Sequence, residues 1–133
     1  MKNGFVFLMG LFLISSAGAH EGHDKMPGVV SAPHPGGIVQ SSGQLYVELV
    51  TKSDGVEIYA FDHDMKVVGP KELKLSATMT FPKKAKGEPV KLSEHADGFL
   101  AKISAKGSHR YVLDLVVTYK GKSEKVKFNV EPQ

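Results

Sequence analysis

Cysteine is absent from the 133 residues of this chain. Its absence excludes disulfides, thiolate metal sites, thiol catalysis and lipid attachment at a lipobox cysteine. Small exported domains often depend on disulfides for stability, so a domain without them must be held together by packing alone. The length suits one domain with a buried core.

Arginine is almost as scarce, since Arg110 is the only one. The other basic residues are lysines dispersed along the chain, which has a pI of about 9.0. Nucleic-acid-binding proteins favour clustered lysine and arginine, with added aromatic residues where single strands are bound. That pattern is missing, so we expect no nucleic-acid partner. Scattered lysines also protect sheet edges from aggregation.

Common enzyme signatures are missing as well. The chain has no Gly-x-Ser-x-Gly elbow, no His-Glu-x-x-His motif and no phosphate-binding glycine loop. Serine, histidine and aspartate occur, but no spacing selects a catalytic triad. We therefore expect a protein that is not an enzyme and has no organic cofactor.

Only one long apolar run is present, at the start of the chain. A positive charge at Lys2 precedes apolar residues 4–14, and residues 17–19 (Ala-Gly-Ala) form a small-residue cleavage site. The run is too short for a stable membrane anchor, and no other run approaches spanning length. We predict a cleaved signal peptide over residues 1–19 and a mature protein that begins at His20. Such a protein is periplasmic or secreted and is not integral to the membrane.

Residues 20–35 differ in composition from the rest of the mature chain. They contain three of the six histidines and three of the seven prolines, with almost no periodic apolar pattern. We interpret this segment as a flexible arm. Residues 36–133 are then expected to form the folded domain.

The domain at 36–133 alternates apolar and polar residues, the pattern of half-buried β-strands. Strands are expected at 45–49, 56–61, 73–81, 90–92, 99–103, 111–119 and 126–130. Turns rich in Gly, Pro and Asp separate them, and no window shows a helical stripe. About seven short strands predict an all-β fold, an antiparallel β-sandwich. The length favours the immunoglobulin-like type, although the Cys-Trp-Cys hallmark of antibody domains is missing.

Metal-ligating residue types gather at the expected mature start, His20-Glu21-Gly22-His23-Asp24. The free amine and imidazole of His20 can chelate one ion, His23 can add a nitrogen, and Glu21 and Asp24 can add oxygens. These donors suit Cu(II), Ni(II) or Zn(II), with copper favoured by the affinity order. The alternative is that these are exposed terminal histidines without a role, because a flexible arm loses entropy when it binds.

His34 lies in the sequence Pro33-His34-Pro35-Gly36-Gly37, where the domain begins. The prolines hold the backbone extended, and the glycines permit a tight turn or a close approach. His34 is therefore either a fixed metal ligand to which the arm folds back, or part of a rigid lead-in to the first strand.

The remaining histidines give weaker signals. His63 lies between Asp62 and Asp64, but the loop lacks the pattern of a calcium EF-hand, and aspartate favours turns for local reasons. His95 and His109 are expected in polar turns. Met79 alternates with apolar residues and is expected in the core.

Residues 33–62 also resemble a family signature. The residues concerned are Pro33, His34, Gly36, Gly37, Val39, Gly43, Val47, Glu48, Leu49, Val50, Val56, Glu57, Ile58, Tyr59 and Asp62, with Pro35 inserted after the histidine. They resemble the His-Gly-Gly-x-Val … Gly … Glu-Leu-Val … Val-Tyr … Asp pattern of small periplasmic β-domains that accompany heavy-metal efflux systems, alone or attached to periplasmic adaptor proteins. The resemblance implies a role in handling copper, zinc or a related ion, with an efflux complex as partner.

Two functions are consistent with these observations. The first is a periplasmic metal-binding protein that buffers copper or zinc or delivers it to an efflux system. Its metal ligands are His20, Glu21, His23, Asp24 and His34. The second is a non-enzymatic envelope protein-interaction module in which the histidines are incidental. It predicts an exposed apolar patch or an open strand edge.

Overall fold

The computed structural model describes residues 30–84, 86–105 and 107–132. Within them the chain forms nine β-strands and no helix, so no helix in this part is able to cross a membrane. The strands are β1 (Ile38–Ser41), β2 (Tyr46–Lys52), β3 (Gly55–Phe61), β4 (Leu73–Thr80), β5 (Glu88–Val90), β6 (Leu92–His95), β7 (Gly98–Lys102), β8 (Tyr111–Tyr119) and β9 (Lys122–Val130).

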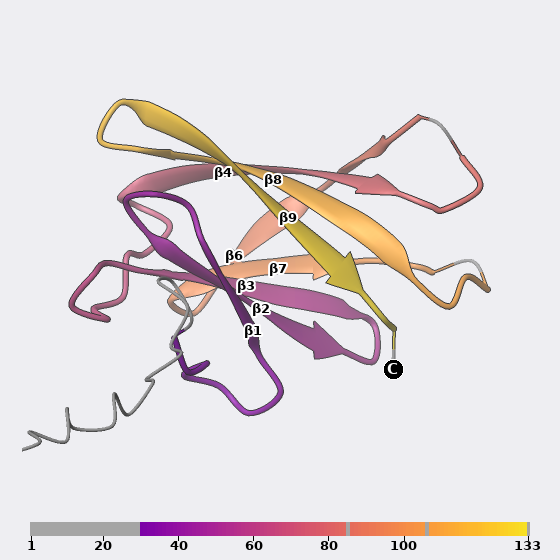
Figure 1. The fold of residues 1–133 in the computed structure, drawn as a ribbon, viewed down its shortest axis with the longest axis horizontal. Helices are drawn as coiled ribbons and strands as arrows, with labels where there is room; N and C mark the ends of the chain where they lie inside the picture. Colours follow the sequence, from indigo (N-terminus) through magenta and orange to yellow (C-terminus); the bar gives the residue numbers. More distant parts are fainter. Residues whose placement is uncertain (1–29, 85, 106, 133) are drawn as a thin grey trace, which may run out of the picture.

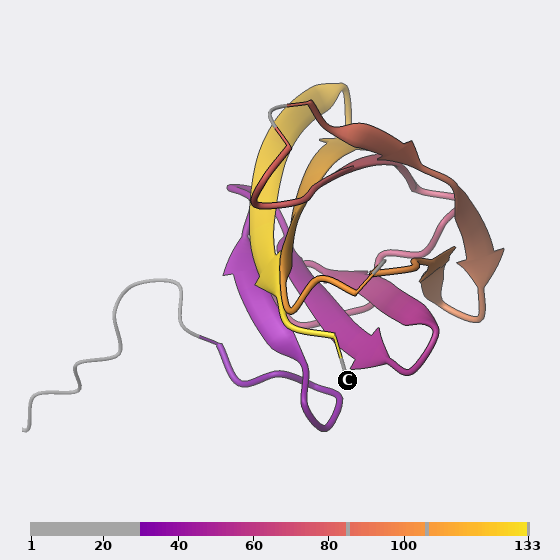
Figure 2. The ribbon, with the colours of Figure 1, turned by 90° about the vertical axis from the view of Figure 1, so that its right-hand side faces the viewer.

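The strands form two antiparallel sheets. One has five strands in the order β1-β2-β3-β7-β6, and the other has four in the order β5-β4-β8-β9. Figure 1 shows β4, β8 and β9 layered over the five-stranded sheet. Viewed from the side in Figure 2, the two sheets curve around the core between them. The prediction of an all-β antiparallel sandwich is confirmed.

The seven expected strands are all present, with two additions. β1 forms an edge strand where the alternation of apolar and polar residues is weak. The short strand expected at 90–92 is divided at Lys91 into β5 and β6, which belong to different sheets. The chain therefore passes from the four-stranded to the five-stranded sheet at this point.

The expected turn at residues 94–98 is shorter than predicted. His95 belongs to β6 and pairs with Gly98 of β7, which leaves only two residues in the turn. Ala96, the first of them, has a positive φ of 50°. A two-residue hairpin turn needs positive φ angles to match the strand twist, which explains the tight connection. The prediction that His95 lies in a turn is wrong.

The core lies between the two sheets. Its members are the inward residues of the alternating strands, among them Val47, Leu49, Ile58, Leu113, Leu115, Val126 and Phe128. Met79 is also buried there, as its alternation predicts. Because the described part of the chain contains no disulfide, this apolar packing supplies the main stabilisation.

A second apolar cluster lies on the outer face of the five-stranded sheet. Val50, Tyr59 and Phe61 are buried there, and Tyr46 and Met65 pack against them. We call these five residues the outer-face cluster. It explains why β2 and β3 are buried on both faces, and it borders the site described next.

Candidate functional site

The candidate site is centred on the buried carboxylate of Glu48, which hydrogen-bonds to His34, four residues before β1. Glu48 of β2 is 0% exposed, although its position in the strand alternation directs it to the outer face. Its Oε2 accepts a hydrogen bond of 2.8 Å from the backbone N–H of His34. Its Oε1 lies 2.5 Å from Nδ1 of the His34 ring. Both oxygens of this carboxylate are therefore satisfied by one residue.

The local sequence explains how His34 reaches Glu48. The N–H of Gly37 donates to the carbonyl of His34, which closes a four-residue turn. Pro35 at the second position and Gly36 at the third, with a φ of 74°, fit a type II turn. A side chain at Gly37 would overlap the carboxylate of Glu48. The two glycines therefore provide both the tight turn and the close approach that the sequence suggested.

The His34 ring stacks on Tyr59. The ring centroids are 4.2 Å apart and the planes differ by 19°. Tyr59 is the cross-strand partner of Glu48, so a single register position on β2 and β3 supplies both contacts to His34. The imidazole is thus fixed at one edge by a carboxylate and on one face by an aromatic ring.

The Tyr59 hydroxyl donates a hydrogen bond of 2.7 Å to Oε2 of Glu57, two residues earlier on the same face. This hydrogen bond, together with burial and the negative charge of Glu57, raises the pKa of Tyr59 to about 12. The phenol therefore stays protonated at neutral pH. Tyr59 consequently packs against the His34 ring as a neutral phenol, and its hydroxyl is held by Glu57.

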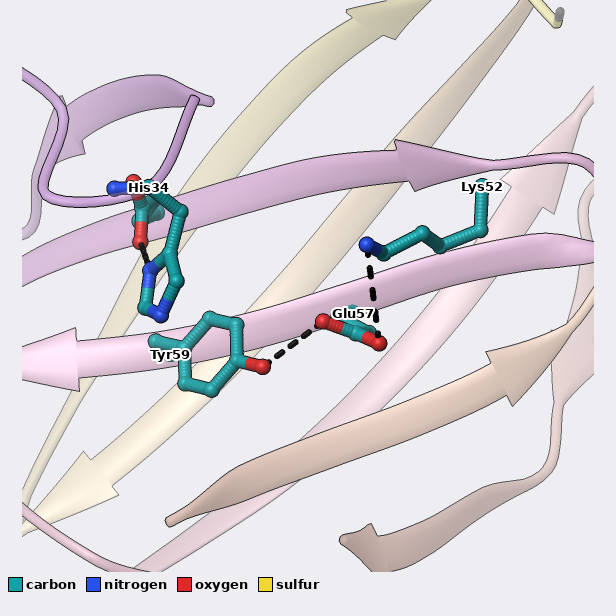
Figure 3. A network of polar contacts seen from close by, with 5 residues as sticks. His34, Lys52, Glu57 and Tyr59 are labelled. Carbon is teal, nitrogen blue, oxygen red and sulfur yellow. Dashed lines mark hydrogen bonds and ion pairs between the residues drawn. The ribbon is translucent and has the colours of Figure 1, made fainter. Parts of the chain in front are cut away.

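The polar contacts continue along the outer face beyond Tyr59. Figure 3 shows Tyr59 between His34 and Glu57, with Lys52 on the far side of Glu57. The Lys52 Nζ and His95 Nε2 atoms each lie 4.0 Å from Oε1 of Glu57. Both of these side chains are about half exposed, so their contacts with Glu57 contribute little to stability.

The predicted site residues divide into two groups. His34 is described, and its surroundings favour a fixed ring over a freely rotating one. His20, Glu21, His23 and Asp24 lie outside the described residues, as does the predicted signal peptide. Within the part of the chain that is described, no three histidine, aspartate or glutamate side chains are grouped to hold a metal ion.

The loop around His63 is explained by turn chemistry. Asp62 Oδ1 accepts hydrogen bonds of 2.9 Å from the backbone N–H groups of Asp64 and Lys66. This is the local role of aspartate in turns that the sequence suggested. The His63 ring lies edge-on to Tyr46, with centroids 5.5 Å apart.

Three residues of the site, Glu48, Glu57 and Tyr59, were not predicted as site residues from the sequence, although all three belong to the family signature at residues 33–62. In an alternating strand, outward glutamates are normally exposed, and this is how Glu48 and Glu57 look from the sequence. A further signal was the outward tyrosine and phenylalanine on β3, Tyr59 and Phe61. Large apolar residues on the outward positions indicate a face that other residues cover.

The arrangement around His34 has a definite chemical consequence. A carboxylate only accepts hydrogen bonds, so Glu48 requires a proton on Nδ1, and in the neutral form of the ring the lone pair is then on Nε2. The side chain is 42% exposed, which keeps the ring open to solvent. Histidines that bind metals commonly have their second ring nitrogen held in this way by a carboxylate. The site therefore holds one oriented imidazole ring.

Comparison with known proteins gives no assignment. No family model, no curated protein and no solved structure matches this chain.

Proposed function

We propose that this chain is a periplasmic metal-binding protein of the copper or zinc class, which buffers the ion or passes it to an efflux system. The observation that carries the proposal is the buried Glu48 carboxylate on Nδ1 of the half-exposed His34. It orients Nε2 as a ligand before any ion arrives. The resemblance of residues 33–62 to efflux-associated periplasmic domains, and the signal peptide expected at 1–19, support the same role.

His34 supplies one ligand, so the proposal needs further donors. His20 and His23, with Glu21 and Asp24, are the nearest such set in the chain. An extended chain spans roughly 3.3–3.6 Å per residue, so the residues between Asp24 and His34 are long enough to fold back. A set of imidazoles, an amine and carboxylates favours Cu(II) over Zn(II). The sandwich serves as a rigid support for His34, and we assign it to the immunoglobulin-like type on its two antiparallel sheets.

The proposal is tested by isothermal titration of Cu(II) and Zn(II) into the chain that begins at His20, confirmed by mass spectrometry. We expect one ion per chain. The H34A variant should bind at least about tenfold more weakly, which corresponds to about 1.4 kcal/mol, and H20A/H23A should not bind. His109 is exposed and lies in a loop remote in sequence from these residues, so H109A is the matched control and should bind like the parent chain.

The loss of metal affinity in each variant shows whether His34 takes part in binding. Full affinity in H34A with loss in H20A/H23A would mean that the terminal segment binds alone and His34 is structural. Because imidazole ligands must be neutral, affinity should also fall from about pH 7.5 to about pH 5. Equal affinity at the two pH values would contradict this ligand set.

One observation favours the second candidate function, an envelope interaction module. β1 is an edge strand, and its first residue, Ile38, is an apolar side chain that is 44% exposed. An open edge with an exposed apolar residue is able to accept a strand of another protein. Deletion of residues 20–32 distinguishes the two candidates, because it removes all the proposed metal ligands except His34 and keeps β1. Retention of function in this deletion would favour docking through the sandwich.

A further inference from the structure

The two sheets of the sandwich carry opposite charge. Residues 30–70 and 92–105 build the five-stranded sheet and its loops, and they contain seven acidic and three basic residues. Residues 71–91 and 107–131 build the four-stranded sheet, and they contain eleven basic and five acidic residues. The formal charges are therefore −4 and +6. A chain with a net charge of only +3 is thus strongly polarised.

Part of this positive charge lies on the outer face of the four-stranded sheet. On β4, β8 and β9 the inward residues are core, so their neighbours in sequence point outward. Lys74, Lys125 and Lys127 are exposed on this outer face, and Asp114, opposite Lys127, is the acidic residue among its outward positions. Within the described residues none of these three lysines forms an ion pair. We call the outward residues of β4, β8 and β9 the basic face.

Between the lysines the basic face is built from short side chains. The register places Lys74 beside Thr118 and Ser123, and it places Ser76 beside Val116 and Lys125. Neither aromatic residues nor arginine occur among the outward positions of these three strands. At the end of the sheet, Lys71, Lys74 and Lys120 line a hollow together with one acidic residue, Glu72, so the hollow extends the positive surface.

These features indicate the kind of partner. Protein interfaces are enriched in aromatic residues and arginine and depleted in lysine, and this face has the reverse composition. Arginine is also the residue of choice for bidentate recognition of single carboxylate or phosphate groups, whereas lysine acts as a point charge. Lysines spread over a broad face of short side chains fit a surface whose negative charges are diffuse. A layer of anionic lipid headgroups has that property.

We propose that the basic face docks the protein on a membrane surface containing anionic phospholipid. The five-stranded sheet, with His34 and most of the acidic residues, then faces away from the lipid. The contact is peripheral and electrostatic, and it requires no apolar insertion. It rests on the charge distribution and is independent of metal binding.

The test is co-sedimentation with vesicles of phosphatidylglycerol and phosphatidylcholine, compared with phosphatidylcholine alone. The chain from residue 20 to 133 is used, because it contains every described strand and lacks the apolar segment 4–14, which by itself has affinity for lipid. We expect binding only to the anionic vesicles. Binding should be lost when salt rises from about 0.05 M to about 0.5 M, because salt screens exposed charges.

Charge-matched variants locate the contact. The K125E/K127E variant should reduce the partition onto anionic vesicles by at least about thirtyfold. The K66E/K102E variant changes the net charge equally on the acidic half and should stay within about twofold of the parent. K125Q/K127Q provides a milder change if reversal destabilises the fold, which thermal melts by circular dichroism report.

Three results would overturn the proposal. They are absence of binding to anionic vesicles at low salt, equal losses in the two reversed variants, and binding to polyglutamate without binding to vesicles. The last result would indicate an acidic protein as the partner.

Discussion

Replacement of Glu48 by glutamine tests the central contact of the site with almost no change in volume. The two oxygens of Glu48 accept hydrogen bonds from two donors of His34, the backbone N–H and Nδ1–H. Glutamine has only one oxygen, so one of the two donors loses its acceptor. The backbone N–H has no alternative form, whereas a neutral imidazole can move its proton. We therefore expect the amide oxygen of the E48Q variant to accept from the backbone N–H and its NH₂ group to donate to Nδ1, with the ring proton moved to Nε2.

The size of the expected loss in stability follows from the two hydrogen bonds that Glu48 accepts. Hydrogen bonds to a charged group contribute about 1.5–3 kcal/mol and neutral ones about 0.5–1.5 kcal/mol, and two bonds are affected. Part of the loss is offset because a neutral amide is less costly to bury than a carboxylate. We expect E48Q to lower the free energy of unfolding by about 2 kcal/mol. Metal affinity should fall about 10- to 100-fold, the usual effect of losing the carboxylate behind a histidine ligand.

Two measurements check this reasoning. Urea denaturation gives the change in stability, and long-range proton–nitrogen NMR correlations of the imidazole identify which nitrogen carries the proton. The ring of His109 in the same spectrum is the internal control and should not change. A proton on Nε2 in the parent chain would refute the assignment of Nε2 as the free nitrogen, and a proton on Nδ1 in E48Q would refute the expected shift of the ring proton in this variant.

Three further predictions concern the same structure. In G37A the added methyl group would overlap the carboxylate of Glu48, so urea denaturation should show a loss of about 1–3 kcal/mol; unchanged stability would contradict the close packing. Tyr59 has a pKa of about 12, above the value of about 10 in an unfolded chain, so its contribution to stability is present below about pH 10 and is lost as pH rises towards 12. E57A should lower this pKa in a spectrophotometric titration, and an unchanged value would exclude the hydrogen bond as its cause. Leu115 is fully buried, so L115A should cost about 2–5 kcal/mol in the same denaturation assay.

The strands of this fold were predictable because most of them have one face in the core. Along β8, for example, Leu113, Leu115 and Val117 are buried and the residues between them are not, which produces a clear period of two. β1 has no such signal, because as a short edge strand it has no fully buried residue. Its position depends on pairing with β2, which only the folded chain determines.

Only His34 and the turn that follows it could be predicted as part of the candidate site from the sequence. The turn depends on neighbouring residues, so Pro35, Gly36 and Gly37 indicated it directly. The partner of His34 was not predictable, because the contact with Glu48 spans fourteen positions and depends on how the segment before β1 crosses β2. An outward glutamate in an alternating strand has the same pattern whether it is exposed or covered. The covering segment lies outside the strand, so the periodicity of the strand does not include it.

A fixed His34 also lowers the entropy that the proposed metal site must lose. Ordering the backbone costs about 1–2 kcal/mol per residue, so a site formed only from residues 20–24 would lose that entropy for every ligand. In the proposed site, Glu48 and Tyr59 already hold His34 in place. Metal binding then closes a loop that ends at His34. Loop closure depends weakly on length, since a doubling costs about 0.6 kcal/mol, or roughly threefold in affinity.

A last prediction concerns the length of this loop. A glycine-serine insertion after Met26 doubles the number of residues between Asp24 and His34. Copper affinity by titration should fall only about threefold, less than the loss in H34A. The matched control is the same insertion in H34A, where it should have no effect because no loop is closed. If the insertion abolishes binding in the parent chain, the segment between Asp24 and His34 must itself contact the ion, and a site closed by a simple tether is wrong.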